Sequence, residues 1–155
     1  MTDKVHATTP AEARTLWVLG DQVRFMGQVD GTDLHVLDVV VPPGSGTPPH
    51  THRSPEIFRV SEGEVTFGIF GDGPPRMIVA GPGTVVTVPS NVGHNYQNRG
   101  SSPAVMTSIL ETQMVDFFSE IGSREQPPAG PPAPEAIEAV MAACARHGIR
   151  VLEAA

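Results

Sequence analysis

The chain has 155 residues, with 10 Lys and Arg against 17 Asp and Glu and a formal net charge of −7. This length predicts one domain with a single core, and the acidic balance argues against nucleic acid or an anionic membrane surface as a partner. The one cysteine, Cys144, excludes an internal disulfide and is typical of a reducing compartment. No apolar run reaches the roughly 20 residues that span a bilayer, and a signal-peptide pattern is absent, so we expect a cytoplasmic protein.

Turn-forming residues divide most of the chain into short extended segments. Glycine and proline occur 16 times each, helix formers are sparse, and the runs between turns alternate apolar and polar side chains. About nine short strands separated in this way predict a small antiparallel sandwich or barrel. The expected strands cover residues 15–19, 22–26, 33–41, 56–60, 64–70, 76–80, 84–88, 94–98 and 104–110.

The chain ends differ in character from this central part. Residues 1–14 predict an N-terminal arm, 15–122 the barrel with a short amphipathic capping helix at 114–121, and 123–133 a linker rich in Pro and Gly. Residues 134–155 predict a C-terminal helix, with Pro134 at its start and Gly148 as its stop signal. Cys144 falls on the apolar stripe of that helix, which favours a packing role over a nucleophilic one.

One short segment concentrates two histidines and a glutamate. His50 and His52 stand two residues apart where the chain is expected to be extended, so both imidazoles point to the same face. Glu56 follows four residues after His52, and Pro55 breaks the run so that the chain can turn before the next strand. A second segment would bring the imidazole of His94 to the same point. Three neutral nitrogens and one carboxylate oxygen suit a divalent first-row transition metal.

These two segments resemble the two sequence motifs of the cupin family. The first motif, G-x5-H-x-H-x3,4-E-x6-G, is matched at every spacing from Gly44 to Gly63, and the second, G-x5-P-x-G-x2-H-x3-N, from Gly83 to Asn98. Asn91 departs from the family glycine, but asparagine tolerates the left-handed conformation, so we expect the turn to persist. The resemblance covers roughly residues 33–111 and implies an all-β fold, a small jelly-roll barrel with the metal inside, here followed by short C-terminal helices.

A histidine pair on a strand is more often a surface feature or a packed core pair than a ligand pair. The carboxylate and the distant third histidine, each at its motif spacing, favour a metal site instead. We therefore expect one divalent ion of Ni, Fe, Mn, Co, Cu or Zn per chain, bound by His50, His52, Glu56 and His94.

Alternation along the strands predicts which side chains line the barrel beside the metal. The predicted substrate contacts are mostly apolar, with one phenol, and include no Arg or Lys, which suits an aromatic or otherwise apolar small molecule. They are Leu37, Phe58, Phe67, Ile69 and Tyr96.

With these walls, the resemblance points to single-domain, quercetinase-like dioxygenases. In such enzymes the metal binds a flavonol oxygen, the glutamate takes the substrate proton, and dioxygen attacks the resulting enolate. Glu56 would thus be both a ligand and the catalytic base. Two alternatives remain, namely a non-oxidative isomerase or cyclase of a polyketide-like enol and a non-catalytic cupin that binds a small molecule.

We also expect a homodimer. An open jelly-roll sheet leaves edge strands, and residues 15–26 supply apolar strand sequence that could pair across an interface. The family resemblance points the same way.

Overall fold

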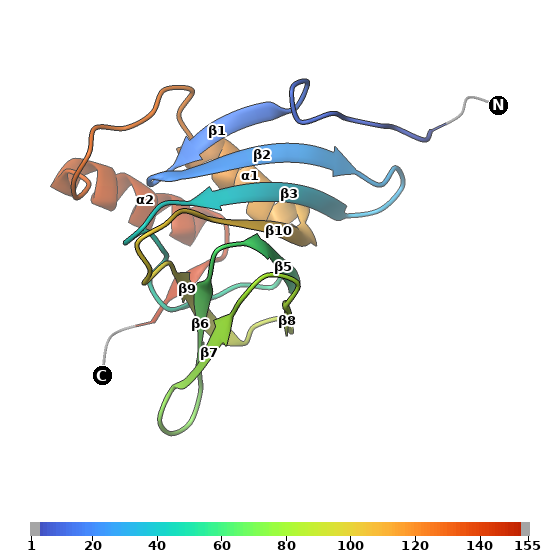
Figure 1. The fold of residues 1–155 in the computed structure, drawn as a ribbon. Coiled ribbons are helices and arrows are strands. Elements are labelled where there is room, and N and C mark those ends of the chain that lie inside the picture. Colours follow the sequence, from blue (N-terminus) through green and yellow to red (C-terminus); the bar gives the residue numbers. More distant parts are fainter. Residues whose placement is uncertain (1–3, 153–155) are drawn as a thin grey trace.

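A computed structural model describes residues 4–152 of the chain. Over these residues two antiparallel sheets face each other and enclose a hydrophobic core, which confirms the predicted all-β jelly-roll architecture (Figure 1). The first sheet has the strand order β1-β2-β3-β10-β5-β8 and the second has the order β11-β4-β9-β6-β7. The strands are β1 (Arg14–Val18), β2 (Asp21–Gln28), β3 (Leu34–Val41), β4 (His50–Thr51), β5 (Glu56–Glu62), β6 (Val65–Phe70), β7 (Arg76–Ala80), β8 (Val85–Val88), β9 (Gly93–Gln97), β10 (Ala104–Glu111) and β11 (Arg150–Val151).

All nine predicted strands are present, with ends that differ from the prediction by at most two residues. The alternation that predicted them is visible in β5, where Glu56, Phe58 and Val60 are buried while Ile57 and Arg59 are exposed. Such alternation is what a sheet with one face on the core requires. The inward-facing residues of both sheets therefore build the core. The same alternation of buried and exposed positions places the Glu56 side chain inside the barrel.

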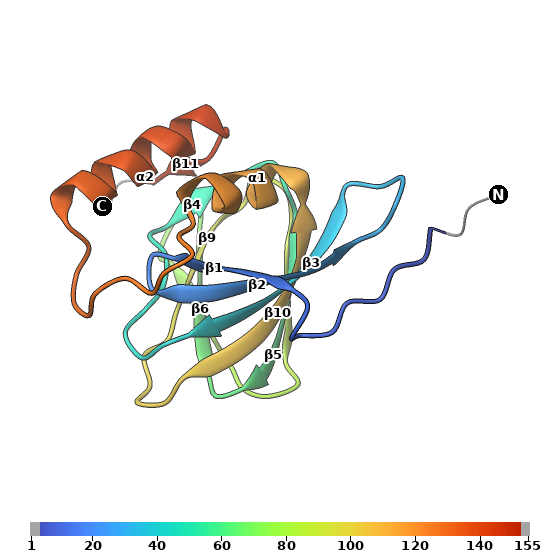
Figure 2. The same cartoon turned by 90° about the horizontal axis from the view of Figure 1, so that it is seen from above.

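Two helices follow β10 and cover one end of the barrel (Figure 2). Helix α1 (Thr112–Ile121) begins directly after β10 and buries Met114, Val115 and Phe117. Helix α2 (Pro134–Arg146) has Pro134 at its start and packs outside α1, burying Ala143 and Cys144. Cys144 is thus a packing residue. Within the described residues no helix is long and apolar enough to cross a membrane.

The C-terminal segment is part of the barrel's core. After α2 the chain turns at Gly148, whose φ is +72°, and forms the two-residue strand β11, which pairs with β4. Ile149 is buried in the same hydrophobic cluster as the sheet residues. The predicted C-terminal helix, 134–155, did not include this strand; in the structure the helix ends at Arg146 and β11 follows it. Residues 153–155, like residues 1–3 of the N-terminal arm, lie outside the described residues.

The loops that carry the histidines are held by tight backbone geometry. Asn91 has a φ of +64°, so the expected left-handed turn is confirmed at the position where the motif has glycine. Gly46 approaches the neighbouring strand so closely that an added Cβ would lie 2.3 Å from the Tyr96 carbonyl oxygen. The buried Asn98 amide donates to the Val41 carbonyl at 2.9 Å. These contacts fix the two loops against each other.

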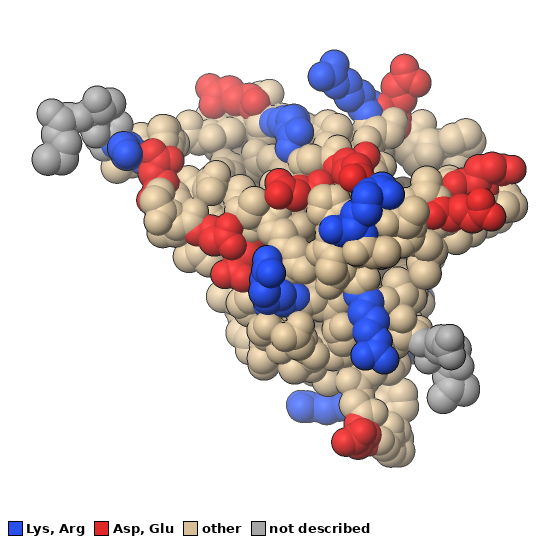
Figure 3. All heavy atoms as spheres, turned by 180° about the vertical axis from the view of Figure 1, so that it is seen from behind, with Lys and Arg blue, Asp and Glu red and all other residues tan. Residues whose placement is uncertain are grey.

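Positively and negatively charged side chains are mixed on the face of the molecule shown in Figure 3. Lys and Arg side chains are interspersed there with Asp and Glu side chains. A uniformly basic face, as a nucleic-acid partner would require, is not seen in this view.

Candidate metal centre

The three predicted histidine ligands come together at one point between the sheets. His50 on β4 pairs in register with His94 on β9, and His52 follows β4 by one residue. The ring centroids are 4.5 Å apart for His50 and His94, 4.9 Å for His52 and His94, and 5.3 Å for His50 and His52. One nitrogen from each ring lies within 4.8 Å of the other two, which is close enough for all three to hold one metal ion.

Each imidazole is oriented by a hydrogen bond to a backbone carbonyl two residues away. The Nδ1–H groups donate from His50 to Pro48 at 2.8 Å, from His52 to Ser54 at 2.7 Å and from His94 to Val92 at 2.8 Å. A carbonyl oxygen can only accept, so in each neutral ring the proton is on Nδ1 and the lone pair is on Nε2. Hydrogen bonds of this kind fix the tautomer and the ring orientation of metal-binding histidines.

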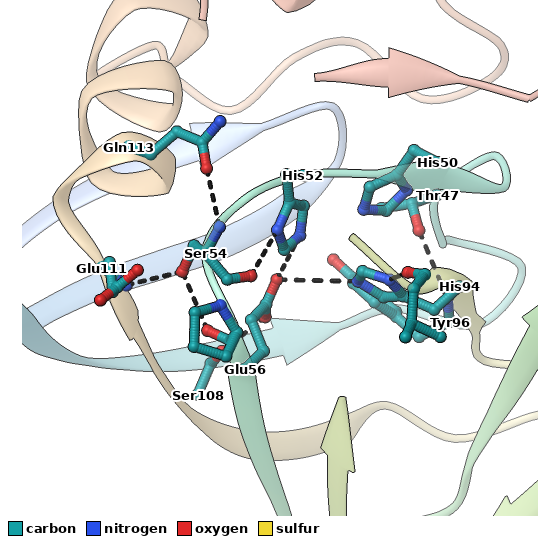
Figure 4. Close-up of polar contacts among 12 residues, drawn as sticks. Thr47, His50, His52, Ser54, Glu56, His94, Tyr96, Ser108, Glu111 and Gln113 are labelled. Carbon is teal, nitrogen blue, oxygen red and sulfur yellow. Dashed lines mark hydrogen bonds and ion pairs between the residues drawn. The ribbon is translucent and has the colours of Figure 1, made fainter. Parts of the chain in front are cut away.

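The Glu56 carboxylate approaches two of the three imidazoles (Figure 4). Its Oε1 atom lies 2.8 Å from His52 Nε2 and 3.8 Å from His94 Nε2. Both nitrogens are buried and have no hydrogen-bond donor or acceptor partner of suitable geometry. Since the ring protons are already used on Nδ1, neutral imidazoles would direct two lone pairs at an anionic oxygen. Such a group of acceptors requires a cation, which is the condition that a divalent metal meets.

Ser108 holds the other oxygen of this carboxylate. Its hydroxyl lies on β10, is buried, and donates to Glu56 Oε2 at 3.0 Å. Glu56 therefore directs Oε1 toward the imidazoles while Oε2 is held by the opposite strand. Ser108 was not predicted from the sequence as a site residue, although its inward position on β10 follows from the alternation of that strand.

Burial and mutual charge shift the proton equilibria of the site. Burial lowers the pKa of His50 to about 4, and the neighbouring His94 and His52 act in the same direction. For Glu56, burial alone would raise the pKa, but the proximity of His52 and His94 outweighs burial and lowers the pKa to about 2. Glu56 is therefore an anion and His50 a neutral imidazole at pH 7, which are the protonation states that metal binding requires.

These shifts predict an acid-labile metal-free protein. In the unfolded chain His50 has an ordinary pKa near 6.5, whereas in the folded chain its pKa is about 4. Between these values the unfolded chain binds a proton that the folded chain does not, so stability falls as pH decreases from about 6.5 to about 4. Because His50 is only half-buried, we expect a loss of about 1 to 2 kcal/mol.

The measurement is the urea midpoint at pH 7, 6 and 5 in the presence of a chelator. The variant His50→Gln cannot take up the proton, so its midpoint should change less over this range. Equal slopes for the wild type and the variant would contradict this origin of the acid lability.

The five predicted substrate contacts lie at different depths. Leu37, Phe58 and Phe67 are buried in the hydrophobic core, and Ile69 is half-buried on β6. The rings of Phe58 and Phe67 are 5.0 Å apart, and Phe58 lies 6.5 Å from His94 between ring centroids. Their role as substrate contacts stays a prediction.

Tyr96, the one polar wall residue, is part of a buried polar group that was not predicted. Its hydroxyl donates to Asp21 Oδ2, and the Ser45 hydroxyl donates to Asp21 Oδ1 at 2.5 Å. Burial raises the pKa of Asp21 against the effect of these hydrogen bonds, and burial followed by the Asp21 charge raises the pKa of Tyr96 well above 10. Asp21 directly precedes the predicted strand 22–26, whereas in the structure it begins β2 and is buried like Val23. Its spacing of two residues from Val23 is the sequence signal for this inward position.

Residues 37–110 match the family model of the cupin domain. Together with the two-sheet topology, this match decides the fold. The chain has the cupin fold. The matched segment contains all four residues of the candidate metal centre, whereas α1 and α2 lie beyond it. No curated protein sequence matches the chain significantly.

Several solved structures share the cupin barrel. An RmlC-like cupin from Shewanella frigidimarina NCIMB 400 has a TM-score of 0.62 at 19% identity, with 76% of this chain and 99% of that chain covered. The polyketide cyclase RemF from Streptomyces resistomycificus has a TM-score of 0.60 at 17% identity, over 100% of this chain and 88% of that chain. The FeII HppE structure has a TM-score of 0.60 at 18% identity, with 71% of this chain and 62% of that chain covered. At these identities the similarity concerns the fold.

Proposed function

We propose that the protein is a metal-dependent enzyme that acts on an enolic or aromatic small molecule. The observation that carries this proposal is the cluster of three imidazoles in which the buried Nε2 atoms of His52 and His94 lie 2.8 Å and 3.8 Å from Glu56 Oε1. A buried cluster of acceptors costs folding free energy unless a cation accompanies it, so its presence favours a ligand-binding role over a structural one.

One divalent transition metal per chain would be held by His50, His52, His94 and Glu56. The bound metal would polarise a substrate oxygen as a Lewis acid and leave positions for further ligands. The chain contributes the orientation of the imidazoles through their Nδ1 hydrogen bonds and a carboxylate that is ionised before the substrate arrives. The shared fold of the FeII HppE structure supports a first-row metal without selecting one.

Glu56 is the residue to which we assign proton abstraction. A hydroxyl of the substrate next to Oε1 would transfer its proton to Glu56, and the enolate that remains would be open to attack by dioxygen. Ser108 keeps Oε2 in place while Oε1 accepts the proton. A metal held by the imidazoles would also attract Oε1, so the proton transfer would require Glu56 to loosen from that metal. The apolar predicted walls suit a flavonol-like substrate, which gives a quercetinase-like dioxygenase as the specific form of this proposal.

A non-oxidative cyclase or isomerase is the second candidate. One observation favours it: the polyketide cyclase RemF aligns with this chain over its whole length, including the part beyond the matched cupin domain. The same Glu56 would then remove a proton from a polyketide-like enol, and no oxygen would be consumed.

The test is a metal analysis of protein purified without chelator, followed by a flavonol and polyketide screen under air and under nitrogen. We expect about one divalent metal per chain and turnover of a flavonol with oxygen uptake. Turnover that is equal under nitrogen would select the cyclase or isomerase. Protein that neither carries nor takes up metal would refute the proposal.

We also propose that the protein forms a homodimer through the edge of the larger sheet. Strand β1 is at that edge, and among residues 4–152 an isolated β-bridge reaches it at Trp17, from Ser123. The remainder of the edge would pair with a second copy. Light scattering at tens of micromolar should give twice the chain mass of 16.4 kDa. A monomeric mass at that concentration would contradict the dimer.

A further inference from the structure

A single side chain joins the metal-binding segment to the end of the C-terminal helix. Gln113, the second residue of α1, accepts a hydrogen bond from the Ser54 backbone N–H at 2.9 Å through Oε1. Through Nε2 it donates to the His147 carbonyl oxygen at 2.8 Å, where α2 ends. Figure 4 shows the Gln113 amide pointing from α1 toward Ser54, on the side away from His50 and His94.

Ser54 connects this amide to a metal ligand. It is buried and lies between His52 and Glu56 in the chain, and its carbonyl oxygen is the acceptor for His52 Nδ1–H. Its hydroxyl accepts a hydrogen bond from the Glu111 backbone N–H at 2.9 Å. The position of Ser54 is thus set from the start of α1, and the orientation of the His52 ring depends on that position.

The C-terminal segment also touches the segments that carry the other two histidines. Val151 pairs with His50 in the β11–β4 ladder, and the Leu152 N–H donates to the Pro49 carbonyl at 2.8 Å. The Leu152 side chain packs against Gly93, the residue before His94, where an added Cβ would lie 2.9 Å from it. The segment is anchored by Ala143, Cys144 and Ile149 in the core.

We propose that Gln113 is a positioning residue of the metal centre, which couples the docked C-terminal segment, 134–152, to the orientation of His52 through Ser54. Gln113 touches none of the predicted ligands, so its effect passes through the Ser54 peptide. The expected effect of Gln113 on metal affinity rests on the proposed metal centre. Its effect on the tautomer of His52 does not, because that tautomer is fixed in the metal-free protein as well.

A surface hollow of about 550 Å³ lies against this junction and is lined by Gln113, Arg53 and His147, among others. Water from this hollow can solvate the Ser54 N–H if the amide is removed. A Gln113→Ala protein should therefore fold, while its Ser54 peptide is no longer tied to α2.

The experiment compares three variants with the wild type. Gln113→Ala removes both hydrogen bonds. Gln113→Glu keeps an acceptor for Ser54 N–H but cannot donate to the His147 carbonyl. Arg146→Ala is the matched control, because Arg146 joins α2 to Glu120 of α1 at the surface and does not contact Ser54. Circular dichroism verifies that each variant is folded.

Two readouts are taken on each protein. The first is the dissociation constant of Zn²⁺ measured against a chromophoric chelator. The second is the ¹⁵N chemical shift of the His52 ring nitrogens in the metal-free protein, which reports the tautomer independently of metal binding and of activity.

In the wild type we expect the Nδ1–H tautomer of His52 alone. Gln113→Ala should show a mixture of tautomers and bind Zn²⁺ about 10–100-fold more weakly, as is usual when an outer partner of a ligand is lost. Gln113→Glu should fall between the wild type and Gln113→Ala, and Arg146→Ala should match the wild type.

Wild-type tautomer and affinity in Gln113→Ala would overturn the proposal. Wild-type behaviour of Gln113→Glu would overturn the role assigned to the C-terminal segment. If the wild type binds no Zn²⁺, the proposed metal centre fails, and the ¹⁵N shifts still decide whether Gln113 orients His52.

Discussion

Replacing Glu56 by glutamine should lower the turnover of metal-loaded enzyme by about 10²–10⁴-fold, the usual contribution of a positioned base. Glutamine keeps the shape of the side chain and an oxygen that can face the metal, but it cannot take a proton. Glu56 is the acid–base group closest to the imidazoles, and its Oε1 atom lies 2.8 Å from His52 Nε2. The measurement is substrate turnover with oxygen uptake, compared at equal metal content.

Glu62→Gln is the matched control, because Glu62 lies at the exposed far end of the same strand, β5. It should turn over like the wild type. If metal-loaded Glu56→Gln keeps full activity, Glu56 is at most a ligand and takes no part in proton transfer. Weaker metal binding with normal turnover at saturation would lead to the same conclusion.

Removing one imidazole should have the largest effect on metal binding. We expect His52→Ala to lose its metal on dialysis, with an affinity reduced by more than the 10–100-fold that follows loss of an outer partner. His52 is buried and approaches Glu56 more closely than His94 does, so its removal takes away the imidazole nearest to the carboxylate. Elemental analysis and chelator competition measure the loss.

Thermal unfolding gives an independent measurement of the same change. Excess metal at 100 times the dissociation constant should stabilise the wild type by about 2.7 kcal/mol and leave His52→Ala nearly unaffected. His6→Ala is the control, since His6 contacts only Asp30 at the surface in the described structure. An unchanged metal content in His52→Ala would show that the four residues do not act as one site.

The sequence was sufficient for the parts of the site that depend on spacing. His50, His52 and Glu56 lie within seven residues, so the short spacing, together with the turn expected at Pro55, keeps them close to one another. His94 required the second motif, and the register of β4 with β9 then places it opposite His50. The same alternation predicted nine strands, because each has one buried face.

Contacts that depend on long-range register could not be predicted in this way. Ser108 reaches Glu56 because β10 pairs with β5 in one register, which shifts at a bulge between Val105 and Met106. A slip of one residue would direct Ser108 away from the core, and the sequence carries no clear signal for the bulge. The quercetinase-like activity, the dimer and the substrate contacts depend on partners outside the chain and stay predictions.

Each imidazole donates from Nδ1 to a carbonyl close to it in the chain, so the orientation of the metal-binding rings is set separately from the shape of the predicted substrate pocket. Ring orientation is set within two residues of each histidine, by the carbonyls of Pro48, Ser54 and Val92. The predicted walls come from other strands, β3, β5 and β6, with Tyr96 of β9 as the exception. Substitutions at these wall positions can therefore change which molecule fits the barrel while the orientation of the three imidazoles stays constant. A lineage of such proteins could diversify its substrates without rebuilding its reactive centre.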